Sequence, residues 1–139
     1  MAQIKRIIAN QLMLIMIGVV ISPPGVVSVC SGGQLELTCT VAGTFLEWSF
    51  FLVTEGETMA RRFSRILNPG SVPATSDLEV NSITINFSRI SAKDSQPLVS
   101  RLLITPVNDG LNGTVVNCTD ILASNTSSTH ISKLSMRAP

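Results

Sequence analysis

Few residues of this chain could supply the base, nucleophile or metal site that catalysis needs. The single histidine, His130, has no carboxylate close to it in sequence, and both Ser/His/Asp and Cys/His catalysis require a histidine-like base. Cys30 and Cys39 lie nine residues apart, which with one histidine gives no zinc-type spacing. Glu55 and Glu57 remain as a carboxylate pair that could meet in space. We expect no enzyme activity, no metal site and no cofactor.

The size and charge of the chain limit the classes of protein it can be. With 139 residues there is room for one domain and a targeting segment. The net charge is +1, and the charges are not gathered into a basic run. This pattern lacks the electrostatic footprint of a protein that binds a nucleic-acid backbone. We therefore expect no nucleic-acid partner.

The N-terminus has the layout of a secretory signal, a basic start followed by a short apolar run. Lys5 and Arg6 are the basic residues, and the run extends from Leu12 to Ile21. We interpret residues 1–22 as a cleaved signal peptide or an uncleaved signal anchor, 23–25 as a Pro/Gly linker, and 26–137 as the folded domain. A buried N-terminal helix is the alternative. Ser22 and Ser28 are small enough for cleavage, although Pro23 directly after Ser22 disfavours it.

Glycosylation sequons also favour export, because Asn-x-Ser/Thr tripeptides are acceptors in secreted proteins. They begin at Asn86, Asn112, Asn117 and Asn125. We expect Asn86 and Asn125 to be exposed. We expect Asn112 to be needed at a corner of the fold, and Asn117 to be a poor acceptor.

The rest of the chain predicts an all-β protein, because short alternating segments are separated by Gly, Pro, Asn and Ser. One-faced alternation of this kind indicates antiparallel sheets packed on each other. We expect only short, poorly defined edge strands between residues 54 and 82. The clearest predicted strands cover 34–40, 45–51, 82–88, 98–105, 114–121 and 129–136, with an edge strand at 26–29.

Three inward-facing residues carry a resemblance to a known family: Cys39 at the end of one strand, Trp48 in the next, and Cys118 near the C-terminus. Together with the patterns Leu35-x-Leu37-x-Cys39 and Asn112-x-Thr114-x-Val116-x-Cys118, they resemble the immunoglobulin superfamily over residues 26 to 137. The resemblance implies an antiparallel Greek-key sandwich, a Cys39–Cys118 disulfide between its sheets, and Trp48 packed on that disulfide, with Leu37 and Val116 in the core. A generic β-sandwich with incidental cysteines is the alternative.

Such a disulfide closes a long loop, which is worth about 4 kcal/mol in the chain-entropy model. The chain also departs from the family. Trp48 follows Cys39 more closely than usual, and Val116 stands where the family has its corner tyrosine. Asn112 replaces the usual aspartate, so backbone bonds or Asn112 must tie the corner. The long segment between Cys39 and Cys118 indicates a variable-like or intermediate type.

Three surface features are candidates for interaction. Cys30 is the odd cysteine, which suggests an intermolecular bridge or a free thiol, or else a buried residue. Phe45, Glu47 and Phe51, with Ser49, lie on the face opposite Trp48 and suggest an interface. Alternatively, Phe45 belongs to the preceding loop and Phe51 lies under the next strand.

A cluster of Arg61, Arg62 and Arg65 could contact an acidic partner, but a charged edge strand that discourages aggregation explains it equally. The leading hypothesis for function is an extracellular recognition or adhesion module that binds a protein partner or itself. The alternatives are a spacer domain of a larger extracellular protein, and a protein held at the cell surface by its own N-terminal segment.

Overall fold

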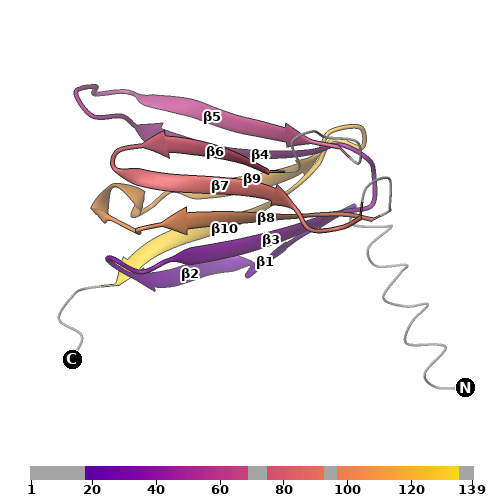
Figure 1. Cartoon of the computed structure of the whole chain (residues 1–139), viewed down its shortest axis with the longest axis horizontal. Helices are drawn as coiled ribbons and strands as arrows, with labels where there is room; N and C mark the ends of the chain where they lie inside the picture. The colour runs from indigo at the N-terminus through magenta and orange to yellow at the C-terminus, as the bar shows by residue number, and fades with distance from the viewer. Residues whose placement is uncertain (1–17, 69–74, 93–96, 135–139) are drawn as a thin grey trace, which may run out of the picture.

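Apolar and polar residues alternate along most of the chain, and each alternating segment forms a strand with one buried face. The computed structural model describes residues 18–68, 75–92 and 97–134, which form ten strands and the 3-10 helix η1 (Asp109–Leu111). The strands make two five-stranded sheets packed face to face (Figure 1). No helix within these ranges is long and apolar enough to cross a membrane.

Sheet 1 is antiparallel throughout and has the strand order β1-β3-β8-β7-β6. Strand β1 forms one edge, pairing with β3 from Val19 opposite Val41 to Ser22 opposite Thr38. The bounds are β1 (Val19–Ser22), β3 (Leu35–Val41), β6 (Thr75–Val80), β7 (Ile83–Arg89) and β8 (Leu98–Thr105).

Sheet 2 has the order β2-β10-β9-β4-β5. Strand β2 runs parallel to β10, whereas the other neighbours are antiparallel. The parallel pair arises because β1 and β2 form one extended segment that crosses from sheet 1 to sheet 2 at Pro23 and Pro24. The bounds are β2 (Gly25–Cys30), β4 (Leu46–Val53), β5 (Ala60–Leu67), β9 (Val115–Asp120) and β10 (Asn125–Leu134).

The core lies between the sheets and is formed by the inward-facing positions of both. Leu37, Trp48 and Val116 are all buried there. A disulfide joins Cys39 of β3 in sheet 1 to Cys118 of β9 in sheet 2. This strand order and the inter-sheet disulfide confirm the predicted fold class, an immunoglobulin-like β-sandwich.

The sandwich begins at Val19, earlier than the expected start at residue 26. Val19 and Ile21 are each 2% exposed, whereas Val20 between them is exposed, so the end of the apolar run alternates as a strand does. The export segment predicted for residues 1–22 otherwise lies outside the described residues.

The segment between residues 54 and 82 also differs from expectation. It contains two full strands, β5 with eight residues and β6 with six, where the sequence predicts short edges. Strand β10 likewise begins at Asn125, earlier than the predicted residue 129. Both β5 and β6 are edge strands, so polar residues interrupt their alternation without a penalty from burial.

Candidate functional site

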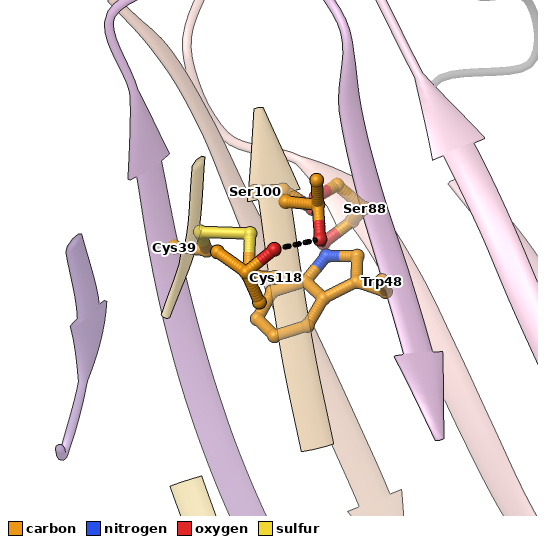
Figure 2. The surroundings of a disulfide bond; sticks show 7 residues. Cys39, Trp48, Ser88, Ser100 and Cys118 are labelled. Carbon is orange, nitrogen blue, oxygen red and sulfur yellow. Dashed lines mark hydrogen bonds between the residues drawn. A yellow bond between two sulfur atoms is a disulfide. The ribbon is translucent and has the colours of Figure 1, made fainter. Parts of the chain in front are cut away.

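The disulfide and Trp48 form the centre of the sandwich (Figure 2). Trp48 on β4 lies opposite Cys118 on β9, and the Cα atoms of Cys39 and Cys118 are 6.5 Å apart. The pairing implied by the resemblance is therefore present.

A buried hydrogen-bond chain continues from the tryptophan into sheet 1 (Figure 2). Trp48 Nε1 donates to Ser100 Oγ over 2.8 Å, and Ser100 Oγ donates to the carbonyl oxygen of Ser88 over 2.7 Å. Both Trp48 and Ser100 are fully buried, so the hydroxyl satisfies an indole N–H that water cannot reach. This chain joins β4 of one sheet to β8 and β7 of the other. Sequence reasoning missed Ser100, because one serine among inward positions gives no signal.

The outer surface of sheet 2 carries a group of exposed apolar side chains over β4 and β5. Phe51 is 54% exposed, Val53 50% and Ile66 57%. Phe45, directly before β4, is 37% exposed. We call this surface the β4–β5 face, and it consists of Phe45, Glu47, Phe51, Val53, Arg62 and Ile66.

One ion pair lies within the β4–β5 face. Arg62 Nη2 is 3.1 Å from Glu47 Oε1, across the ladder between β5 and β4. Ser49, which was expected to be exposed there, is buried. Its side chain is short and lies in register between Ser64 of β5 and Asn117 of β9 on a central strand, so neighbouring residues cover it.

The predicted arginine cluster is divided between two sides of β5. Arg62 lies on the outer face, whereas Arg61 and Arg65 lie on the same side as Phe63, toward the other sheet. The guanidinium of Arg61 is 5.7 Å from the centre of the Phe63 ring. The guanidinium of Arg65 is likewise 5.7 Å from the centre of the Phe87 ring. Arg65 Nε also donates to Ser76 Oγ of β6 over 3.2 Å, which links the sheets at their open edge. These contacts favour a structural role for Arg65.

The free cysteine lies at the opposite edge of sheet 2. Cys30 ends β2 and its thiol is exposed, so the alternative of a buried residue is wrong. A disulfide to another chain stays a prediction.

The four sequon asparagines differ in solvent accessibility, and the exposed one is not among those expected to be exposed. Asn112 is exposed beside η1, whereas Asn86 and Asn125 are half-buried. The amide of Asn86 donates to Asp77 Oδ1 over 2.6 Å, which holds the side chain against β6. Asn117 is half-buried on the outer side of β9, and its Oδ1 accepts a hydrogen bond from Ser128.

Asn108 and backbone hydrogen bonds tie the corner that lacks a tyrosine. Asn108 Oδ1 accepts from the backbone N–H of Gly110 over 3.0 Å, and its Nδ2 donates to the carbonyl of Asn81 over 2.9 Å. Backbone bonds add to this, since Leu111 donates to Asn108 and Asn112 to Asp109. An Asn that starts a turn is common, so sequence alone gave it no special weight.

An open depression of about 580 Å³ lies beside this corner, lined by Glu55, Glu57 and Asn108 among others. Glu57 Oε1 accepts a hydrogen bond from Thr54 Oγ1 over 2.7 Å and lies 3.7 Å from Arg61. Its carboxylate is therefore bonded to neighbours rather than to Glu55. Within residues 18–68, 75–92 and 97–134, no group of three or more His, Cys, Asp or Glu residues is placed to hold a metal ion.

The comparisons with known proteins add no family to this description. No protein-family model matches the chain, and no curated protein matches it.

Proposed function

We propose that this chain is an exported recognition domain of the immunoglobulin superfamily that binds a protein partner through the β4–β5 face. The observation that carries the proposal is the exposure of Phe51 and Val53 on β4 and of Ile66 on the paired strand β5. Phe51 lies opposite Arg62 and Ile66 lies opposite Glu47, so the two apolar positions are at the two ends of the ion pair. Each of the three apolar side chains is about half exposed, and together they form an apolar surface that a partner could bury.

The arrangement around the β4–β5 face supports a protein partner. Its apolar side chains surround the Glu47–Arg62 ion pair. Protein interfaces combine aromatic and apolar anchor side chains with a few polar groups that fix orientation. The family resemblance adds support, since many immunoglobulin-like domains pair through the corresponding sheet.

Among the described residues, the outer surface of sheet 1 is more polar, although Val20 is exposed on its β1 edge. Across β3, β8, β7 and β6 its outward positions include Glu36, Arg101, Asn86, Asp77 and Glu79. A glycan on Asn86 would extend from this polar surface and leave sheet 2 free. A glycan on Asn117, in contrast, would stand on sheet 2 beside the β4–β5 face.

Membership of the superfamily is supported by topology. Sheet 1 contains the order β1-β3-β8-β7, and β5 extends the sheet that holds β9 and β4, as in variable-type domains. Export is supported by the signal-like N-terminus and by the disulfide, which persists outside reducing compartments.

The test uses the full chain, secreted from a eukaryotic host and presented as a tetramer to a library of displayed extracellular proteins. Phe51→Ser and Ile66→Ser should each weaken binding of the captured partner by tenfold or more, because each removes an anchor side chain. Ile90→Ser is the matched control, since Ile90 is 52% exposed but lies outside the β4–β5 face. Sedimentation equilibrium of the same variants detects self-association.

Three results would count against the proposal. Binding that Ile90→Ser weakens as much as Phe51→Ser would place the contact elsewhere. If the chain captures no partner and stays monomeric, the alternative of a spacer domain is favoured. Occupancy of Asn117 by a glycan, measured by peptide mapping, would also oppose a partner on this face.

A further inference from the structure

The first strand is part of the folded core, although it lies within the predicted export segment. Val19 and Ile21 are each 2% exposed and pack into the core between the sheets. All four residues of β1 pair with β3, the strand that carries Cys39. Cleavage after Ser22 would remove these side chains and leave β3 as an unprotected sheet edge.

The residues after β1 are also held by the fold. The buried Thr129 of β10 donates its hydroxyl hydrogen to the carbonyl of Pro23, at the crossover between β1 and β2. The path from Val19 to Gly25 is thus fixed at both sheets.

We propose that the exported chain is cleaved between Gly18 and Val19, so that the mature protein begins with β1. Signal cleavage favours small residues at the first and third positions before the bond. Gly18 is the only small residue between Asn10 and Ile21 and would occupy the first of these positions, with Met16 at the third. Water hydrolyses the peptide bond, leaving a carboxylate on Gly18 and an α-amino group on Val19. This proposal rests on export but not on the binding face.

The fold tolerates this cleavage. Within the described residues, the backbone of Gly18 contacts the domain through its carbonyl oxygen, which accepts a hydrogen bond from the Ala42 N–H over 3.0 Å. Ala42 is half-exposed, so water can replace that acceptor. Cleavage at Gly18 therefore removes this hydrogen bond and the packing of the buried Gly18, whereas cleavage after Ser22 removes a whole strand.

Incorporation of β1 into the sandwich also competes with membrane anchoring. With Val19 to Ile21 in the sheet, residues 7–17 are left, which include the polar Asn10 and Gln11 and as a helix would measure about 17 Å. The hydrocarbon core of a bilayer is about 30 Å thick. Val19 to Ile21 thus cannot belong to both a membrane span and β1. This favours release of the folded domain from the membrane over anchoring.

The test is the N-terminus of the full chain after expression in a eukaryotic secretory host, read by mass spectrometry of secreted and cell-associated product. We expect the secreted protein to begin at Val19. Gly18→Leu should abolish that N-terminus, whereas Ser22→Leu, at an exposed position, should leave it unchanged. A secreted product that begins anywhere else, or an uncleaved chain in the membrane fraction, overturns the proposal.

A second measurement distinguishes retention of β1 from its loss without a cleavage-site variant. Ile21→Ala in the full chain should lower the melting temperature of the secreted protein by several degrees, because Ile21 is buried. Val20→Ala, at an exposed position on the same strand, should leave it nearly unchanged. If the two variants melt like the wild type, β1 is absent from the mature protein and the proposal fails.

Discussion

Replacing Ser100 with alanine removes a single oxygen from the centre of the sandwich, and we expect it to lower the free energy of unfolding by about 2–4 kcal/mol. The loss of an acceptor leaves the buried Trp48 N–H unsatisfied, which costs about 1–3 kcal/mol. The Ser88 carbonyl also loses a donor, worth about 1 kcal/mol. Both contacts are short, at 2.8 and 2.7 Å, and Trp48 and Ser100 are shielded from water.

The measurement is urea unfolding of the secreted protein, followed by circular dichroism and by fluorescence. Trp48 is the only tryptophan, so its emission reports on this site. Ser28→Ala is the matched control, because Ser28 is exposed on β2 and its loss should change stability by less than about 0.5 kcal/mol.

A double-mutant cycle separates the hydrogen bond from the change in packing. In a Trp48→Phe background no indole N–H remains, so Ser100→Ala should cost about 1–2 kcal/mol less than in the wild type. Equal losses in both backgrounds would refute the argument that the indole depends on Ser100. A loss below about 0.5 kcal/mol in the wild-type background would refute the whole estimate.

Three further variants test other parts of the fold by the same unfolding measurement. Replacing Cys39 and Cys118 together with alanine should cost about 4 kcal/mol by the loop-entropy argument, and a loss under about 1 kcal/mol would contradict it. Gly43→Ala should cost about 1–3 kcal/mol, because a Cβ there would lie 2.8 Å from the Asp120 carboxylate, which accepts the Gly43 N–H; an unchanged stability would show that the loop relaxes freely. Asn108→Ala should cost about 1–2 kcal/mol by losing two side-chain hydrogen bonds at the corner, and a neutral effect would mean that backbone bonds suffice there.

The sequence predicts those strands in which apolar residues occupy every inward position. Leu35, Leu37 and Cys39 of β3 are such a set, and so are Ile83, Ile85 and Phe87 of β7. In both strands the period of two is visible because inward positions are deeply buried and outward ones are polar. The disulfide could be predicted for the same reason, because both cysteines lie at inward positions of their strands.

An edge strand was expected in the region of β5, but its length was underestimated because arginines occupy inward positions in it. Arg61 and Arg65 flank Phe63 on the side facing the other sheet, where their side chains lie over aromatic rings. An arginine stem can cover apolar surface while its charge stays in water. At the edge of a sheet such residues replace leucine or valine, and alternation disappears from the sequence although the strand remains.

Strand β1 escaped prediction for the opposite reason, because its sequence was too apolar. Val19, Val20 and Ile21 continue the apolar run of the export segment without a break. Only the structure separates them, since Val20 points outward and its two neighbours point inward. Hydropathy cannot divide a run in which a signal-like segment continues directly into a core strand.

The five phenylalanines differ in whether folding of the domain buries them. Phe50 stacks on both Phe63 and the buried Phe87, with ring centres 5.8 and 6.4 Å apart, and the partly buried Phe63 packs against the core. Phe51 follows Phe50 directly but points the other way, so a polar residue there would remove nothing from the core. An exposed phenylalanine gains little from folding, and single cases need no explanation. Phe51 is not a single case, because Val53 is exposed on the same strand and Ile66 on the paired strand β5. Folding of this chain does not bury these side chains, which is why we assign their burial to a partner.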